Sequence, residues 1–235
     1  MKRPRNAKSQ IIDAHTQPRD VKMERPEWRE QLEEHLSNHL GPCRVLHELG
    51  AGFVHIDVRI FEPSRDRPYI TGVTVGVSEH PMVVPDDELD RRHQELMIYL
   101  PASWPVEPNT GAAAEWPFWL LRTLGKFAYA EKTYFSPGHS VALSNPPEPF
   151  APGVFFTTVL LLAPPEAPTF DDLTIGGTPC RFLSALPLTS AEAEYKLSHG
   201  SSALLQRLQE ANVERQIDPA RACAITGKTP PITTG

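Results

Sequence analysis

The chain has 235 residues, of which 40% are hydrophobic and 22% are charged, and these proportions are ordinary for a soluble globular protein. Its formal net charge of −6 argues against a nucleic-acid partner, because a nucleic-acid-binding protein needs a basic face to displace counterions. No apolar run approaches the roughly 20 residues of a transmembrane helix, so we expect no membrane partner either.

Three cysteines, Cys43, Cys180 and Cys223, are far apart in the chain and lack the C-x-x-C spacing of a zinc site. An odd and scattered set of this kind fits a reducing compartment. The N-terminal segment is basic, but no apolar segment follows it, which is not typical of a secretory signal. We therefore expect a cytoplasmic protein, and no motif implies a metal or another cofactor.

The first predicted element is a helix that begins at Pro26, because proline is tolerated at the first helical position. The helix ends at Gly41-Pro42. Its apolar side chains recur every four residues: Trp28, Leu32, Leu36 and Leu40. Alternating apolar residues then predict three strands, over residues 54–61, 69–77 and 93–100. Small residues on one face of the second strand would let another backbone or a helix approach closely.

A second helix is expected over residues 115–130, where a broad apolar stripe predicts core packing for Trp116 and Trp119. Two strands follow, over residues 139–143 and 154–162. The second of these is apolar on both faces, which predicts a position near the middle of a covered sheet.

The C-terminal third combines strands with helices. Residues 173–186 predict one or two strands with a turn near Gly176-Gly177. Thr189 and Glu192 have the spacing of a capping box at the start of a helix. Gly200 interrupts this helix, and we expect Ser201 or Ser202 to cap a second helical segment.

This order of elements predicts an α+β fold, in which a mixed β-sheet of about six strands is flanked by three to four helices in an α/β sandwich. The elements do not alternate strictly, and no Gly-rich dinucleotide fingerprint follows any strand. We expect one domain over residues 23–225, between flexible tails at residues 1–22 and 226–235.

Three polar residues, His55, Asp57 and Arg59, share one face of a predicted strand. In a catalytic site, His55 could act as a general base, Asp57 could orient it, and Arg59 could bind an anionic group of the substrate. Any strand with a polar face produces the same spacing, so we favour a cross-strand polar network that includes Glu95 and Tyr99. The catalytic alternative is a hydrolase or transferase that uses His55, Asp57 and Glu95.

An acidic loop, Asp86–Asp90, precedes Arg92 and Glu95 at the start of the third strand. We favour an ion pair that anchors this loop over contacts from Arg92 and Glu95 to a partner peptide. The loop lacks the ligand spacing of a calcium-binding loop. Trp104 is a candidate anchor for a protein interface, where tryptophan is enriched.

The stretch from Gly76 to Trp104 resembles the signature of the suppressor of fused family. In that family a G-x-S strand precedes an acidic loop, an R-x-E-L-x-x-x-L-P strand and a tryptophan. Here those elements are Gly76-Val77-Ser78, Asp86–Asp90, Arg92, Glu95, Leu96, Leu100, Pro101 and Trp104. Further local matches follow in the family's order between Leu46 and Leu208.

The resemblance implies a binding module and not an enzyme. Animal members of the family look like regulators that sequester a transcription factor by clasping an extended peptide of it, and some bacterial relatives are proposed as immunity proteins against toxins. We therefore expect the chain to sequester or inhibit a protein or extended peptide, basic because the chain itself is acidic. A non-inhibitory adaptor is the remaining alternative. The candidate partner contacts are Asp57, Arg92, Glu95, Tyr99 and Trp104.

Overall fold

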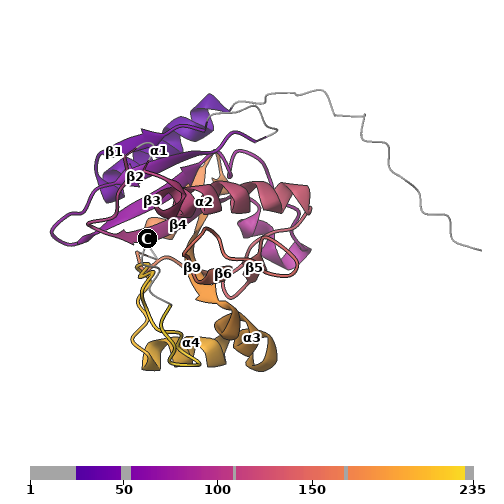
Figure 1. The fold of residues 1–235 in the computed structure, drawn as a ribbon. Coiled ribbons are helices and arrows are strands. Elements are labelled where there is room, and N and C mark those ends of the chain that lie inside the picture. The colour runs from indigo at the N-terminus through magenta and orange to yellow at the C-terminus, as the bar shows by residue number, and fades with distance from the viewer. Residues whose placement is uncertain (1–24, 49–53, 108–109, 167–168, 231–235) are drawn as a thin grey trace, which may run out of the picture.

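The computed structural model describes residues 25–48, 54–107, 110–166 and 169–230. Within this part of the chain, one seven-stranded sheet has helices on both faces (Figure 1), and two further strands form a separate two-stranded sheet. The predicted α+β fold with a mixed sheet is confirmed. The predicted N-terminal tail and residues 231–235 lie outside the described residues.

The main sheet has the strand order β1-β2-β3-β4-β9-β6-β5. Neighbouring strands are antiparallel except β4 and β9, which are parallel. Its strands are β1 (Cys43–Leu46), β2 (Asp57–Phe61), β3 (Tyr69–Val75), β4 (Gln94–Pro101), β5 (Ser140–Ala142), β6 (Phe156–Leu162) and β9 (Arg181–Thr189). The small sheet pairs β7 (Thr174–Ile175) with β8 (Thr178–Pro179) around the predicted Gly176-Gly177 turn.

Four α-helices and two short 3₁₀ helices occur in the described residues. They are α1 (Pro26–Leu40), α2 (Ala112–Ala130), α3 (Ser190–His199), α4 (Ser201–Glu210), η1 (Asp86–Arg91) and η2 (Thr169–Asp171). The capping box of α3 is present, since Thr189 Oγ1 accepts from the Glu192 N–H. The expected serine cap of α4 is wrong: Gly200 is the N-cap residue, and Ser201 Oγ donates to the Gly138 carbonyl at 2.9 Å.

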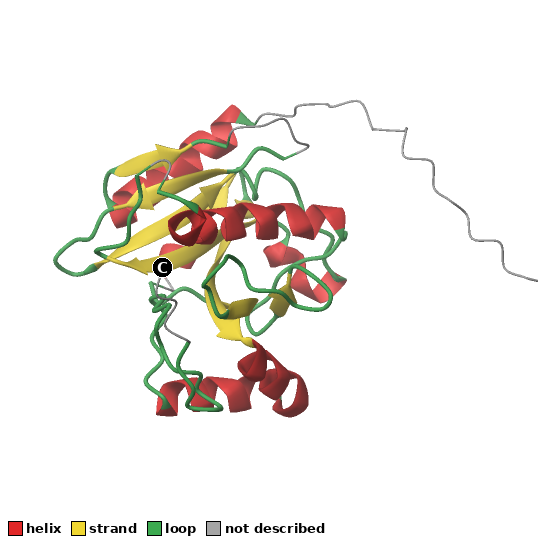
Figure 2. Cartoon of the chain, viewed as in Figure 1, coloured by secondary structure: helices red, strands yellow, loops and turns green. Residues whose placement is uncertain are grey.

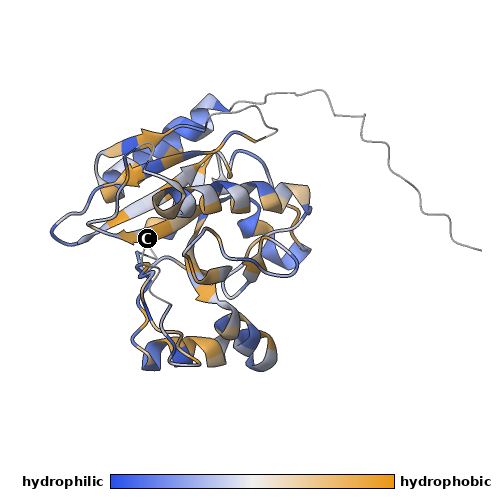
Figure 3. Ribbon diagram, in the orientation of Figure 1, coloured by the Kyte–Doolittle hydropathy of each residue, from blue (hydrophilic) through white to orange (hydrophobic). Residues whose placement is uncertain are grey.

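The helices bury opposite faces of the sheet. The apolar stripe of α1 packs on the face that carries Val73, Val75 and Met97, and α2 packs on the other face, against residues such as Val58 and Ile98. Leucines of α4 cover the part of the first face formed by β6 and β9. Figure 3 shows much of the hydrophobic sequence in the sheet, between helices of mixed hydropathy.

Glycines allow α2 to lie close to the sheet. A Cβ atom on Gly125 would come within 2.6 Å of Val77 and 2.7 Å of Ile56, and one on Gly72 would come within 3.1 Å of Ile98. The close approach of α2 depends on Gly125 of the helix, because the near neighbour of Gly72 belongs to β4 and Phe118 of α2 would be in ordinary contact at 3.6 Å. At Gly76 the small residue instead admits another backbone, that of His55. In this sequence Gly125 serves close packing, although glycine weakens the helix itself.

The segment after α4 returns as a loop toward the sheet (Figure 2), where it pairs with β4 beyond the part of β4 that pairs with β9. These strands pair in parallel only from Gln94 with Arg181 to Met97 with Ser184. Beyond that point Tyr99 pairs with Gln216, and the Ile217 N–H donates to the Tyr99 carbonyl at 2.9 Å. The return segment continues past residue 225, the predicted end of the domain, into a turn in which Cys223 N–H bonds to the Lys228 carbonyl.

Two expectations about strands need correction. β1 was not expected, because its four residues are mostly exposed and show no apolar alternation. β6 is buried along its whole length, as its apolar sequence predicts, but it lies next to the edge strand β5 and not in the middle of the sheet.

Candidate functional site

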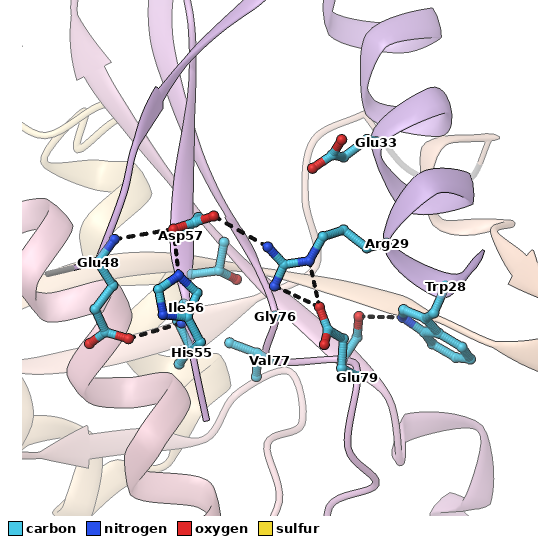
Figure 4. A network of polar contacts seen from close by, with 12 residues as sticks. Trp28, Arg29, Glu33, Glu48, His55, Ile56, Asp57, Gly76, Val77 and Glu79 are labelled. Carbon is cyan, nitrogen blue, oxygen red and sulfur yellow. Dashed lines mark hydrogen bonds and ion pairs between the residues drawn. The ribbon is translucent and has the colours of Figure 1, made fainter. Parts of the chain in front are cut away.

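Asp57 is the centre of a polar network at the start of β2 (Figure 4). Its carboxylate accepts from the Glu48 N–H at 3.1 Å, from Arg29 at 3.3 Å and from His55 Nε2 at 3.1 Å. Burial by itself would raise the pKa of Asp57, but the Glu48 hydrogen bond and the nearby cationic groups outweigh it and lower that pKa. Asp57 is 3% exposed, so it is an internal anion that ties α1 to β2.

The same network holds α1 to the loop after β3. Arg29 donates from Nε to Glu79 at 2.8 Å, and Trp28 donates from Nε1 to Ser78 Oγ at 2.9 Å (Figure 4). Each contact spans 50 residues of sequence. The chain therefore uses its first described helix to fix the strand end that contains the G-x-S sequence.

The signature residues Gly76, Ser78 and Glu95 form one buried structure. Glu95 accepts from the Gly76 and Ser78 N–H groups at 3.1 and 2.9 Å, from Ser78 Oγ at 2.7 Å and from Thr74 Oγ1 at 2.5 Å. Gly76 has φ +126°, and a Cβ there would lie 2.1 Å from the His55 carbonyl oxygen. Only glycine fits at position 76. The residues Gly76, Ser78 and Glu95 of the family signature therefore serve the internal structure of the protein and are not a surface for partners.

The residues of the catalytic alternative do not converge. His55 and Asp57 are hydrogen-bonded, but Glu95 is fully buried in β4, two strands from β2, with the partners named above. The predicted network that joins His55 and Asp57 to Glu95 and Tyr99 is wrong for the same reason. Tyr99 is 1% exposed, and its hydroxyl donates to Glu166 at 2.7 Å.

Ion pairs hold the acidic segment, as the favoured prediction has it, but neither Arg92 nor Glu95 forms them. Glu95 points into the protein and Arg92 is exposed. In the described residues the acidic segment is a 3₁₀ helix whose ion pairs are Arg91 with Glu88 at 2.6 Å and Arg181 with Asp90 at 3.5 Å. Of the residues predicted to contact a partner, Arg92 is exposed and accessible to one. Asp57, Glu95 and Tyr99 are buried and are not accessible.

Tryptophans divide between core and surface. Trp104 is half-buried and donates to the Ala114 carbonyl at 2.9 Å, and Trp116 is 2% exposed. Trp119 is 48% exposed, so the expectation that it packs in the core is wrong. The sheet under α2 covers only part of the broad apolar stripe, which leaves Trp119 at its margin.

A groove of about 570 Å³ runs beside β5. It is lined by all three residues of β5, by residues near the end of α2 such as Phe127 and Tyr134, and by Lys196 and Leu197 of α3. Side chains of consecutive strand residues point to opposite faces, so a groove lined by all of them follows the edge of the strand. β5 is the last strand of the sheet, and this edge has no strand partner in the described residues.

Sequence analysis missed Lys196 and Leu197. Leu197 is 81% exposed, and Lys196 donates from Nζ to Ser140 Oγ at 2.8 Å. Burial lowers the pKa of Lys196, because it disfavours the charged amine. The available signal in the sequence was a leucine in a helix with few other apolar residues. The sequence alone does not show that this leucine lies beside a sheet edge.

No group of three or more metal-ligating side chains has a metal-binding arrangement in the part of the chain that the structure describes. No helix among those residues is long and apolar enough to cross a membrane.

Comparison with known proteins identifies the family. The model of the suppressor of fused protein family matches residues 52–222, most of the chain. The protein therefore belongs to the suppressor of fused family, as its signature predicts. Curated proteins gave no match to this sequence.

Solved structures share the fold at low sequence identity. A suppressor of fused homologue from Neisseria gonorrhoeae FA 1090 is 17% identical, with a TM-score of 0.61 over 84% of this chain and 97% of its own. A chain from a Sufu–Fu complex is 13% identical, with a TM-score of 0.57 over 84% of this chain and 91% of its own. Drosophila Suppressor of Fused is 14% identical, with a TM-score of 0.54 over 78% of this chain but only 46% of its own.

Proposed function

We propose that the protein is a binding module that takes up an extended segment of a partner protein along the open edge of β5. The observation that carries this proposal is the groove lined by every residue of that edge strand. A peptide added to a sheet edge gains main-chain hydrogen bonds, and pockets beside the strand select its alternate side chains. Leu197 and Phe127 supply apolar contacts, and Ser140 and Lys196 supply polar ones.

Family membership supports a protein partner, because one structural relative was crystallised in a Sufu–Fu complex. The net charge of −6 favours encounter with a basic protein at long range. The finer proposal is that binding sequesters the partner and blocks its activity, as an immunity protein does to a toxin. An adaptor would bind without this inhibition, and an enzyme would turn a substrate over.

The test begins with an affinity pull-down from the native lysate, read by mass spectrometry, followed by reconstitution with the purified partner. We expect Leu197→Asp to weaken the complex at least tenfold, about 1.4 kcal/mol, because it places a charge in the groove. Leu89→Asp is the matched control, since Leu89 is 53% exposed on η1, away from the groove. Equal losses in both variants would count against the β5 edge.

The partner's own activity then separates the alternatives. Inhibition in the complex, together with rescue of growth when a toxic partner is co-expressed, supports sequestration. Full activity in the complex supports an adaptor. Turnover that disappears in His55→Ala and Asp57→Asn variants, with no stable complex, would favour an enzyme.

A further inference from the structure

A second groove lies at the opposite end of the sheet, between β1 and α2, and encloses about 660 Å³. Its lining includes Val45 and Leu46 of β1 and Glu115, Phe118 and Trp119 of α2. Val45 pairs with Arg59 and Leu46 with Val58, so these two neighbours lie on opposite faces of the sheet. The groove therefore reaches the edge of β1, the first strand in the sheet order.

The charges around this groove are mostly satisfied internally. Lys126 pairs with Glu48, and Arg44 pairs with Glu107 at 2.8 Å. Arg122 donates to the Ile56 and Leu46 carbonyls at 3.1 and 2.6 Å, and burial lowers its pKa. These three cations therefore already have partners within the protein.

Glu115 is different from these groups. It is exposed in the first turn of α2, and no cation pairs with it in the described residues. Arg122 follows seven residues later, about 10 Å along the helix axis, which is too far for a direct ion pair. The groove thus offers one carboxylate that a ligand cation would satisfy.

Trp119 lies four residues after Glu115, so the two side chains are neighbours on the same helix face. The indole is 48% exposed, which is unusual for the largest apolar side chain. A guanidinium group stacks on an aromatic face and also forms a paired hydrogen bond with a carboxylate, whereas an ammonium group lacks the planar fork. The pair of Glu115 and Trp119 therefore favours arginine over lysine.

We propose that the β1–α2 groove is a second docking surface, which binds an extended, arginine-bearing segment of a protein. The segment pairs its main chain with the edge of β1, sets an apolar side chain beside Val45 and lays an arginine between Trp119 and Glu115. This surface is separate from the β5 edge, so the protein contacts its partners at both ends of the sheet.

Fluorescence anisotropy with a labelled peptide, acetyl-Val-Arg-Val-Arg-Val-amide, tests the surface on the full chain. We expect saturable binding that weakens about tenfold in Trp119→Ala and in Glu115→Gln, because each removes one contact of the arginine. Leu89→Asp should leave the affinity unchanged, because Leu89 is exposed on η1 and lines neither groove. Circular dichroism verifies that the Trp119→Ala protein is folded, and Trp119→Phe should retain part of the affinity.

Several results would overturn the proposal. They are equal affinity for the matching peptide with glutamate in place of arginine, unchanged affinity in both α2 variants, and no binding of the arginine peptide at about 1 mM. A loss confined to Leu197→Asp would also overturn it, since the peptide would then occupy the β5 groove. Failure of the β5 edge to bind a partner leaves this test unaffected.

Discussion

Two glutamates, Glu95 and Glu192, are both fully buried but have opposite surroundings. Glu192 receives two hydrogen bonds from Arg221, at 2.6 and 2.7 Å, and others from the Thr189 and Ala224 N–H groups. Glu95 receives four hydrogen bonds, all from neutral groups, and no cation pairs with it among the described residues.

This difference sets the ionisation of the two groups. Burial raises the pKa of Glu95 to about 7, although its four donors favour the charged form. Burial acts on Glu192 in the same direction, but the hydrogen bonds and charge of Arg221 outweigh it and hold the pKa below its ordinary value. Neutral donors alone thus offset less of the desolvation of a carboxylate than a paired guanidinium does.

The largest expected effect comes from breaking the charged pair. Arg221→Met leaves Glu192 buried without its cation, which should lower the free energy of unfolding by about 3–5 kcal/mol. Urea denaturation followed by circular dichroism measures the loss. Arg207→Met is the control, because the Arg207–Glu210 pair is exposed and screened by solvent, so its loss should change stability little. Similar losses in the two variants would contradict the comparison.

The second prediction concerns pH. The pKa of Glu95 is higher in the folded protein than in the unfolded chain, so its contribution to stability is fully present below about pH 4.5 and is lost as pH rises to about 7. In Glu95→Gln the carbonyl keeps three donors, and the amide donates to Thr74. We expect this variant to be more stable than the wild type by roughly 2–3 kcal/mol at pH 8 and to converge with it near pH 4.

Glu192→Gln provides the opposite control for the pH experiment. The pKa of Glu192 is lowered on folding, so its stabilising contribution is present above pH 4.5 and is lost as pH falls further. The variant should therefore be less stable than the wild type at pH 8. If both variants shift stability in the same direction at that pH, the assigned ionisation of Glu95 is incorrect.

A smaller effect is expected for Ser78→Ala. Ser78 Oγ donates to Glu95 and accepts from Trp28, so its removal leaves two buried groups with fewer partners. We expect a loss of about 1–2 kcal/mol, measured by thermal denaturation at pH 8, and a further rise in the pKa of Glu95. Ser198→Ala, in an exposed turn of α3, should change stability by less than about 0.5 kcal/mol.

Local patterns predicted most elements of the fold. The stripe of α1, the α3 capping box and the turn at Gly176-Gly177 depend on residues close together in sequence, and each is confirmed. β1 was missed because edge strands with exposed residues lack an apolar pattern. The position of β9 between β4 and β6 also has no local signal, since strand order depends on long-range pairing.

The site was less predictable than the fold. Sequence spacing grouped His55 with Asp57 correctly, but it placed Glu95 in the same network, because spacing within single strands does not show that β3 lies between β2 and β4. Arg221 and Glu192 are 29 residues apart, and nothing local indicates that they meet. The grooves at both sheet edges are lined by segments that lie far apart in the sequence and come together only in the folded protein.

The insertion of β9 between β4 and β6 has a consequence for the protein during its synthesis. A ribosome releases β4 and β6 before β9, so each of these apolar strands first emerges with an edge that its final neighbour has not yet covered. Nascent chains of this kind are open to pairing with one another. We expect polysome-bound chains that end before β9 to need a chaperone, and the need to fall once residues up to Gln216 and Ile217 have been released.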